Sequence, residues 1–379
     1  MNKRVAIIHD YLTEFGGAER TLKTIHDLFP NSTVFTSSYD EKAIPEFKDW
    51  KIITTAAKDL PSFKSLSKQY TFLYPFLFEA FDLKDFDIVI SSWSAWSKCV
   101  ITSHKQLHIS YCHTPPRFLY KYSGESQKRN SWYYKPFVAY IDMYLRVWDF
   151  FSAKRPDYII ANSQTVAKRI KKFYKIDAPV INPPVRTTVE LVLPEGASRF
   201  DTNYFLIVSR LVPYKNIDVV IEAFNNLSYP LRIVGTGKEE ARLKKLAKRD
   251  FAFLGKIDER ELALMYQNCK GVIFPVKDED FGIVPIEAMA HGKPVLAHRS
   301  GGVLDTIEDG KTGMFFEGDK VEDLIEAIKN FDGAIYGQQF DLNYIKNSAK
   351  KYDEAIFRNK FKTFISEKWA AKFNETLTW

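Results

Sequence analysis

The feature that most constrains the fold is a regular alternation of short apolar runs with helical stretches along nearly the whole chain. This pattern is typical of parallel strands whose sheet is covered by helices on both faces. Helices are expected over Ala18–Leu28 and, with Asn162 as a plausible N-cap, over Ser163–Phe173. The expected strands of the first series are Arg4–His9, Thr33–Thr36, Lys51–Thr54, Asp87–Ile90, His108–Cys112, Tyr158–Ala161 and Val180–Asn182.

A proline-rich break separates this series from a second one. After Pro183 and Pro184 the alternation lapses, and Pro194–Ser198 is predicted to be a linker. The chain of 379 residues is long enough for two domains. We therefore predict an α/β protein with two Rossmann-like, doubly wound domains facing a cleft: residues 1–192, with a returning C-terminal helix at 353–379, and residues 193–352. The expected strands of the second series are Tyr204–Ser209, Leu231–Val234, Phe251–Leu254, Gly271–Phe274, Pro294–Ala297 and Gly313–Phe316.

Cysteine usage and the N-terminal residues favour a reducing compartment. Cys99, Cys112 and Cys269 are far apart and form no CxxC pair, so neither a disulfide framework nor a zinc site is expected. The apolar stretch Val5–Ile8 is too short for a signal peptide. The aromatic run Phe72–Phe81 is too short and too interrupted for a membrane span. We expect a cytoplasmic protein.

An acidic stretch follows the expected strand Gly271–Phe274 and leads into a helix. Pro285 suits the first position of that helix, because it has no N–H to leave unpaired there. The free amides beside it, at the positive end of the helix dipole, would form a site for a diphosphate. Glu287 could bind vicinal hydroxyls and Glu279 could reach a sugar, whereas the alternative is an ordinary solvated loop. The predicted anion site comprises Phe281, Gly282, Ile283 and Val284.

Two cations and two glycines follow other strands of the second domain. Arg210 and Lys215 lie in the loop after Tyr204–Ser209, where they could bind phosphate oxygens. The alternative is that they are solvated, as most of the 54 basic residues are. Gly235 and Gly237 permit close approach of the backbone to a ligand, although the dinucleotide fingerprint lacks its third glycine.

The first domain offers two further candidates. Gly16 and Gly17 come after the first expected strand and lie at the start of a helix, where they could form a second anion site. His113 directly follows the strand His108–Cys112, at the sheet edge where ligands bind. A histidine is also commonly a structural residue.

Three metal- or nucleotide-like patterns are rejected. Asp278-x-Asp280 has the spacing of a metal-binding DxD motif, but that motif does not belong to two-domain clefts of this kind. Gly310-Lys311-Thr312 resembles the end of a Walker A loop, yet the upstream glycine is replaced by Asp305. The seven histidines form no HExxH motif. We predict no essential metal.

Together, and in this order, the motifs resemble the family-4 retaining glycosyltransferases of GT-B fold. The resemblance rests on Glu279-x7-Glu287, on Arg210 and Lys215, and on the Gly16-Gly17 loop, and it runs from about residue 4 to residue 350. The segment Ile109–Tyr120 further resembles bacterial mannosyltransferases of O-antigen or capsule assembly.

The resemblance implies a donor nucleotide sugar in the second domain and an acceptor in the first. Retention in this family is often described as a front-face displacement without a protein nucleophile, so catalysis would rest on electrostatic stabilisation of the departing diphosphate. The resemblance implies that the diphosphate is bound by Arg210, Lys215, Gly17 and the amides after Phe281. The ribose would be bound by Glu287, a donor-sugar hydroxyl by Glu279, and the sugar near its reacting carbon by His113. The base would contact the backbone of Lys256 and Ile257, and further substrate contacts would come from Gly16 and Gly235.

The implied function is transfer of mannose from GDP-mannose onto a lipid-linked saccharide in cell-surface polysaccharide synthesis, with no cofactor besides the donor substrate. A UDP-sugar donor is one alternative, because the backbone contacts that select the base are not visible in a sequence. A non-catalytic sugar-nucleotide-binding protein is another. Nucleic acid is not an expected partner, because the net charge of +7 comes without a nucleic-acid-binding motif.

Aromatic and basic residues are dense in two segments of the first domain, Ser62–Phe86 and Trp132–Phe151. One hypothesis is a surface that docks on anionic lipid at the inner face of the cell membrane. The alternative is that these aromatics fill the core and line an acceptor groove. The residues concerned are Lys64, Lys68, Phe72, Tyr74, Phe76, Phe78, Trp132, Tyr133, Tyr134, Lys135, Arg146 and Trp148.

Overall fold

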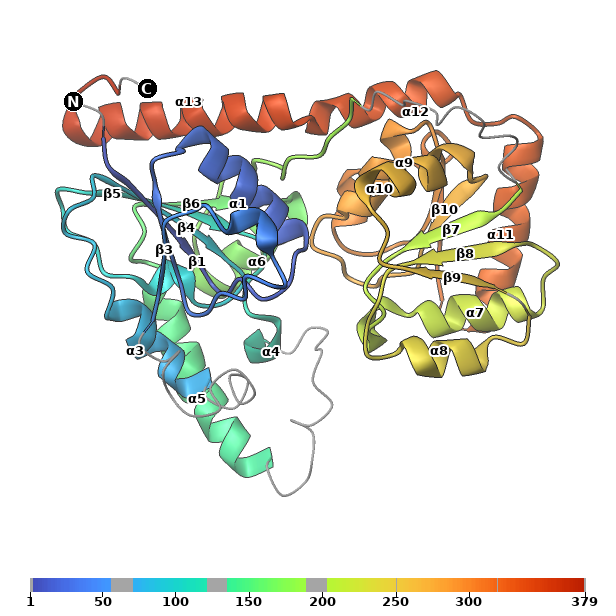
Figure 1. The fold of residues 1–379 in the computed structure, drawn as a ribbon, viewed down its shortest axis with the longest axis horizontal. Helices are drawn as coiled ribbons and strands as arrows, with labels where there is room; N and C mark the ends of the chain where they lie inside the picture. Colours follow the sequence, from blue (N-terminus) through green and yellow to red (C-terminus); the bar gives the residue numbers. More distant parts are fainter. Residues whose placement is uncertain are drawn as a thin grey trace. The chain divides into compact units, whose positions relative to one another are not determined.

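The computed structural model describes residues 3–55, 71–120, 135–188, 203–249, 251–318 and 320–377. They form two compact units, residues 1–184 with 355–379 and residues 185–354. Each unit is built on a six-stranded sheet (Figure 1). The strand pairs of both sheets are parallel. The predicted α/β class with two doubly wound domains is confirmed.

The sheet of the first unit has the strand order β3-β2-β1-β4-β5-β6. The expected seventh strand, Val180–Asn182, is wrong: Val180 makes an isolated bridge to Ala161. Pro179 and Pro183 flank this run, and a proline cannot donate to a strand ladder. The strands are β1 (Val5–His9), β2 (Thr33–Thr36), β3 (Ile52–Thr54), β4 (Ile88–Trp93), β5 (Leu107–Cys112) and β6 (Tyr158–Ala161).

Helices cover both faces of this sheet, which is why its strands are rich in apolar residues. Along β1, Ile7 packs into one hydrophobic cluster, and Ala6 and Ile8 pack into another. The cluster on one face of the sheet includes α1 (Gly17–Leu28) and α13 (Glu354–Phe373), and the cluster on the other face includes α3 (Tyr74–Glu79) and α5 (Lys135–Ser152) (Figure 1). On this second face, α6 (Gln164–Tyr174) contributes to a third cluster.

The C-terminal helix α13 belongs to the first unit, as expected. Phe357, Phe361, Ile365 and Trp369 are buried, because a four-residue spacing places them on one stripe of the helix. The rings of Phe357 and Phe361 meet Tyr111 edge-on, at centroid distances of 5.9 and 6.2 Å. The returning helix therefore completes the core of this unit.

The N-cap expected for α6 is wrong by one residue. Ser163, rather than Asn162, caps the helix: its Oγ accepts a hydrogen bond from the Val166 N–H at 3.1 Å. Serine and asparagine cap helices about equally well, so residue type alone could not distinguish the two neighbours.

The sheet of the second unit has the order β12-β11-β10-β7-β8-β9, and every expected strand is present to within one residue at each end. Helices α7 (Ile217–Asn225), α8 (Glu240–Leu246) and α11 (Val321–Tyr336) cover one face, and α9 (Glu259–Asn268), α10 (Ile283–Ala290) and α12 (Leu342–Ala349) cover the other (Figure 1). The strands are β7 (Phe205–Val208), β8 (Leu231–Val234), β9 (Ala252–Gly255), β10 (Gly271–Phe274), β11 (Val295–His298) and β12 (Gly313–Phe316).

Each sheet has a topological switch point where the strand order reverses. It lies between β1 and β4 in the first unit and between β7 and β10 in the second. Ligands of such sheets bind outside the carboxyl ends of the strands at this point. The loops after these four strands are therefore where functional residues are expected.

Two further observations concern membrane-spanning helices and the reactivity of the cysteines. Within the parts of the chain that the structure describes, no helix is long and apolar enough to cross a membrane. Cys99, Cys112 and Cys269 are buried, free thiols. Burial raises the pKa of Cys99 and that of Cys269 to about 12, so these two thiols are packing residues rather than nucleophiles.

Candidate functional site

An ion pair joins the loops after β7 and β10, at the switch point of the second sheet. Nζ of Lys215 lies 2.6 Å from Oε2 of Glu279, and the two side chains are only 14% and 17% exposed. Burial alone would lower the pKa of Lys215, but the Glu279 carboxylate outweighs it and the net pKa is raised. Two residues predicted from separate motifs are therefore in direct contact.

Arg210 lies in the same loop and is exposed. Its Nη2 donates a 2.8 Å hydrogen bond to the Tyr214 hydroxyl, and its charge acts to lower the pKa of Lys215. The end of this loop is fixed by Asn216, which has a φ of 52° and whose Nδ2 donates to the Pro275 carbonyl at 3.3 Å. Two cations in one strand-end loop make a positive site suited to phosphate oxygens.

The helix after the acidic stretch begins earlier than predicted. α10 starts at Ile283 with Gly282 as N-cap, so the placement of Pro285 at the first position is wrong and it is the third residue. Gly282 takes a φ of 90°, which glycine adopts without strain, and Pro285 still lies in the first turn, where no N–H is needed. Phe281 is 3% exposed and anchors the stretch in the core. The amides of Ile283 and Val284 remain in the first turn.

A pair of glycines that the sequence analysis did not single out holds Glu279. Gly301 has a φ of 76°, and a Cβ atom on it would lie 2.3 Å from the Glu279 carbonyl oxygen. The Gly302 N–H donates to that same oxygen at 2.6 Å. The loop after β11 thus fixes the backbone of Glu279. A Gly-Gly pair just after an expected strand, as at Gly16-Gly17, was the available signal.

Glu287 is oriented by a tyrosine of α9. The Tyr266 hydroxyl donates to Oε2 of Glu287 at 2.8 Å. Tyr266 is itself 1% exposed and stacks on His291 with ring centroids 5.2 Å apart. The carboxylate therefore has a defined direction while Glu287 stays partly exposed. Nothing in the sequence around Tyr266 marked this role.

Gly235 and Gly237 serve close packing between two loops. Gly235 has a φ of 124°, and a Cβ atom there would lie 1.9 Å from the carbonyl oxygen of Ser209; one on Gly237 would lie 2.2 Å from that of Leu211. The loop after β8 is thus pressed against the loop that carries Arg210. A ligand contact of Gly235 stays a prediction.

The segment predicted to contact the base follows β9. Lys256 is exposed, and Ile257 packs partly against the core. The preceding Gly255 carbonyl accepts a 2.7 Å hydrogen bond from Gly235 N–H. This segment is therefore tied to the glycine loop after β8.

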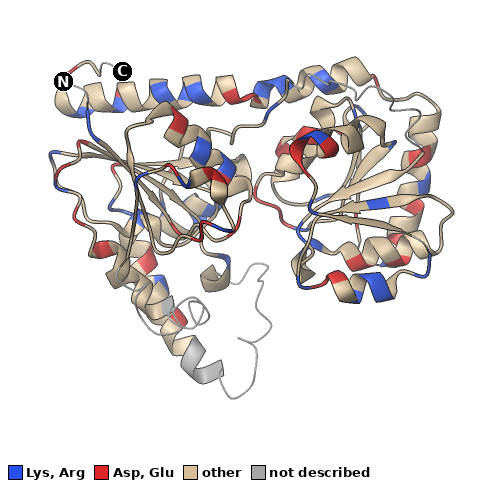
Figure 2. Ribbon diagram, in the orientation of Figure 1, with Lys and Arg blue, Asp and Glu red and all other residues tan. Residues whose placement is uncertain are grey.

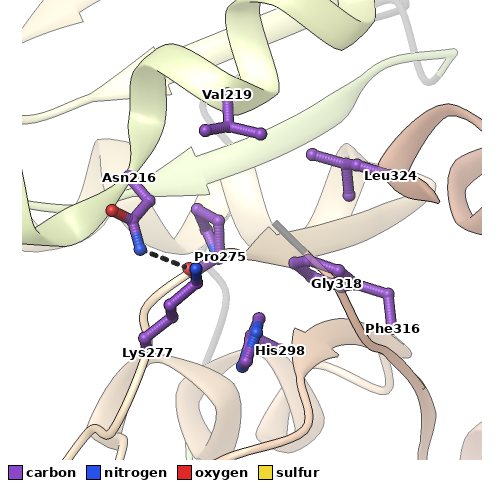
Figure 3. A pocket seen from close by; sticks show the side chains of 8 residues that line it. All are labelled: Asn216, Val219, Pro275, Lys277, His298, Phe316, Gly318 and Leu324. Carbon is purple, nitrogen blue, oxygen red and sulfur yellow. Dashed lines mark hydrogen bonds between the residues drawn. The ribbon is translucent and has the colours of Figure 1, made fainter. Parts of the chain in front are cut away.

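A small cavity of about 40 Å³ near the carboxyl ends of β10, β11 and β12 contains none of the predicted residues (Figure 3). It holds at most a few water molecules, far less than a nucleotide needs. We assign it no ligand. It is lined by Asn216, Val219, Pro275, Lys277, His298, Phe316, Gly318 and Leu324.

In the first unit, the predicted residues gather near the switch point between β1 and β4. The Gly16 N–H donates to Oε2 of Glu19 at 2.8 Å, which holds the start of α1. His113 follows β5, and its Nε2 lies 2.8 Å from Oγ of Ser92. Burial, with a smaller effect of His9, lowers the pKa of His113 to about 3, so its ring is neutral at physiological pH.

The predicted residues are thus divided between the units. Gly16, Gly17 and His113 belong to the first, and the remaining predicted residues belong to the second. Within each unit they lie at the carboxyl ends of strands. Among the described side chains, no group of three or more His, Cys, Asp or Glu residues could hold a metal ion.

Two family models match the chain. The one described as Glycosyltransferase Family 4 matches residues 15–189, and the one described as Glycosyl transferases group 1 matches residues 194–333. Together they include every predicted site residue.

Individual relatives agree with these matches. An uncharacterized glycosyltransferase of Methanocaldococcus jannaschii is 29% identical over 47% of this chain and 50% of its own. The alpha-1,3/1,6-mannosyltransferase of Homo sapiens is 27% identical over 65% of each chain. The O-antigen chain mannosyltransferase C of Escherichia coli is 23% identical over 92% of this chain and 93% of its own. The match thus spans about half the length of the first relative and nearly all of the third.

The solved structure of Anabaena HepE in complex with UDP has a TM-score of 0.70 to this chain at 17% identity, covering 96% of this chain and 100% of that one. At this identity the likeness shows the fold alone, which is GT-B. With both family models in order along two doubly wound units, the chain belongs to the family-4 glycosyltransferases of GT-B fold.

Proposed function

We propose that the enzyme is a retaining mannosyltransferase that moves mannose from GDP-mannose onto a lipid-linked saccharide in cell-surface polysaccharide synthesis. The observation that carries this proposal is the Lys215–Glu279 pair at the switch point of the second unit, beside Arg210 and the start of α10. The relatives named as mannosyltransferases support the choice of sugar, and the O-antigen relative supports the choice of pathway.

The geometry suits stabilisation of a departing diphosphate. Lys215 offers a point charge and Arg210 a planar fork, and the first turn of α10 adds the positive end of a dipole. When a donor binds, its phosphate oxygens compete with Glu279 for the Lys215 ammonium. The released carboxylate can then accept hydrogen bonds from sugar hydroxyls. Charges fixed in advance in a shielded site need little reorganisation in the transition state.

In this mechanism no side chain attacks the sugar. The acceptor hydroxyl attacks the reacting carbon from the face that the diphosphate leaves, and a diphosphate oxygen takes its proton, so configuration is retained. Neutral, buried His113 serves as a hydrogen-bonding partner of the sugar rather than as an acid.

Donor turnover tests the proposal. The protein is incubated with GDP-mannose or with UDP-sugars, and release of GDP or UDP is followed with and without EDTA. We expect GDP release from GDP-mannose that persists in EDTA, because the positive groups of the chain supply the charge. Turnover that is lost in EDTA and restored by manganese would show that Asp278-x-Asp280 was dismissed wrongly.

A UDP-sugar donor is the second candidate. It is supported by the fold likeness to HepE, whose structure holds UDP. Release of UDP from a UDP-sugar, with GDP-mannose left intact, would favour this candidate over the first.

Glu287→Ala is expected to weaken GDP binding by about tenfold or more, because hydrogen bonds to a charged carboxylate contribute about 1.5–3 kcal/mol. Tyr266→Phe keeps the carboxylate and removes only its 2.8 Å positioning bond, so a smaller loss is expected. Titration calorimetry with GDP measures both. Unchanged affinity in folded Glu287→Ala would contradict the ribose role.

We also propose peripheral contact with anionic lipid, through residues that differ from those first expected. Tyr74 and Phe78 are buried core residues, so their assignment to a surface is wrong. Trp148 is partly buried and donates to Oε1 of Glu79 at 3.3 Å, and Arg146 donates to the Leu119 carbonyl at 3.2 Å. Phe72 and Phe76 are exposed. Outside the described residues or side chains lie Lys64, Lys68, Trp132, Tyr133, Tyr134 and Lys135.

The better-supported surface is one side of α5, called here the α5 face. Its members are 45% to 68% exposed, and their spacing places them on one side of the helix. Asp142 and Asp149 of α5 are buried, and Figure 2 shows the described part of the helix largely uncharged. Such a row of aromatic and apolar side chains suits the headgroup boundary of a bilayer. The α5 face consists of Tyr140, Met143, Tyr144, Val147 and Phe151.

Liposome co-sedimentation tests this contact. Because the net charge is +7, we expect the protein to sediment with vesicles that contain anionic lipid and to bind them less strongly when salt is raised. Met143→Glu with Val147→Glu should abolish sedimentation, because each charge must be kept out of the apolar boundary. Tyr336→Glu is the control, because Tyr336 is 90% exposed but lies in the second unit. Protein that stays in the supernatant at low salt would contradict the proposal.

A further inference from the structure

Four polar side chains form a continuous hydrogen-bonded chain at the carboxyl ends of the first sheet. Oε1 of Glu19 lies 3.4 Å from Nε2 of His9. Nδ1 of His9 lies 3.2 Å from Oγ of Ser92, and this oxygen lies 2.8 Å from Nε2 of His113. All four residues are at most 8% exposed. The chain thus connects the start of α1 with the ends of β1, β4 and β5.

Glu19 gives this chain a direction. Its Oε2 already accepts the Gly16 N–H at 2.8 Å, and a carboxylate has no proton to offer. When the His9 ring carries one proton, that proton therefore lies on Nε2 and points to Oε1, which leaves a lone pair on Nδ1. That lone pair takes the hydroxyl proton of Ser92. The Ser92 oxygen then accepts the N–H of His113 Nε2.

We propose that Ser92, oriented by Glu19 through His9, is a positioning residue that holds His113 protonated at Nε2 and leaves its Nδ1 as an acceptor for a hydroxyl of the donor sugar. Among the described residues, no hydrogen bond occupies Nδ1 of His113. The identity of the ligand rests on the proposed function, whereas the tautomer of His113 depends only on the hydrogen bonds that lead from Glu19 to it. An acceptor whose tautomer is fixed in this way discriminates against donors that lack the matching hydroxyl.

Glu19→Gln tests the direction with little change of shape. Glutamine has one carbonyl oxygen, which the Gly16 N–H requires, so its NH₂ group faces Nε2 of His9. His9 then carries its proton on Nδ1 and donates to Ser92. Ser92 donates in turn to Nε2 of His113, and His113 becomes protonated at Nδ1. The substitution should therefore reverse the whole chain.

The tautomer is read by ¹⁵N NMR of histidine-labelled protein at pH 8, where imidazoles are mostly neutral. His113→Asn identifies the signals of His113 by their loss. We expect protonated Nε2 and unprotonated Nδ1 in the wild type, and the reverse in Glu19→Gln. Protonated Nδ1 in the wild type, or an unchanged tautomer in Glu19→Gln, would overturn the proposal.

Kinetics supply the second readout. Ser92→Ala should lower kcat for transfer about tenfold, the value of one hydrogen bond in the site, and Ser92→Thr, which keeps the hydroxyl, should restore most of it. Ser91→Ala is the matched control: its Oγ lies 3.0 Å from Nε2 of His108, on the same strand but outside the chain. An equal loss of kcat in Ser91→Ala and Ser92→Ala would mean a merely structural role and would overturn the proposal.

The two proposals fail separately. If NMR shows the expected tautomers and no nucleotide sugar is turned over, the proposed function is contradicted and the positioning role of Ser92 stands. If mannose is transferred while His113 carries its proton on Nδ1, the proposed function stands and the positioning role of Ser92 is contradicted.

Discussion

Replacing Lys215 by methionine is expected to lower the rate of glycosyl transfer by about a hundredfold or more, or about 3 kcal/mol of transition-state stabilisation. Methionine keeps the stem of the side chain but removes the ammonium that lies 2.6 Å from Glu279. The departing diphosphate then loses a point charge. Arg210→Ala, in the same loop, should have an effect of similar size. Steady-state transfer from the preferred donor measures both.

Lys270 offers a matched control. It pairs with Asp332 in the same unit, with side chains 19% and 17% exposed, but it directly precedes β10, at the opposite end of that strand from Glu279. Lys270→Met should therefore cost comparable stability and leave kcat near the wild-type value. Near-normal turnover in a folded protein that carries both Arg210→Ala and Lys215→Met would remove the diphosphate role.

Lys98→Met is expected to destabilise the first unit by about 3–5 kcal/mol, because it leaves a buried charge without its partner. Lys98 and Asp149 are fully buried, with Nζ 2.5 Å from Oδ1. The hydroxyls of Tyr120 and Tyr174 donate to the other carboxylate oxygen, each at 2.8 Å. These two neutral donors cannot replace the ammonium. Urea unfolding followed by tryptophan fluorescence measures the loss.

A double variant separates the buried charge from the packing. Asparagine at position 149 can still accept from both tyrosine hydroxyls and carries no charge, so Lys98→Met with Asp149→Asn should recover a large part of the lost stability. A Lys98→Met protein as stable as the wild type would contradict the assigned role of this pair.

The strands were predictable because buried parallel strands are short apolar runs between turn residues. Leu231–Val234 and Gly271–Phe274 have the bounds expected from sequence alone. Val180–Asn182 has the same local character, but flanking prolines leave it a single bridge to β6. Local propensity cannot show how many hydrogen bonds the neighbouring strand will offer.

The positions of the site residues in the chain were predictable, and their contacts were not. Lys215 and Glu279 each follow an expected strand, but their ion pair depends on β10 lying beside β7, which no local pattern encodes. The same holds for Ser92 and His9, polar residues in apolar strands. Their burial becomes informative only when their hydrogen bonds are known.

For Asp10, the position in the sequence suggests one role and the structure shows another. A carboxylate directly after the first strand suggests a ligand-binding group, yet it accepts the backbone N–H groups of Ser94, Ala95, Trp96 and Ser97 at 2.7 to 2.9 Å. Its role is to hold the loop after β4 at the switch point.

Thermal unfolding with nucleotide sugars tests most directly whether the enzyme binds a donor through the diphosphate site of the second unit. A ligand that binds the folded protein raises Tm by mass action, with about 2.7 kcal/mol of stabilisation at a hundred times its Kd. We expect GDP-mannose and GDP to raise the Tm of the wild type, and to raise that of Lys215→Met much less. If neither these ligands nor any UDP-sugar raises Tm at millimolar concentration, the site does not bind a sugar-nucleotide donor and the proposed function is contradicted.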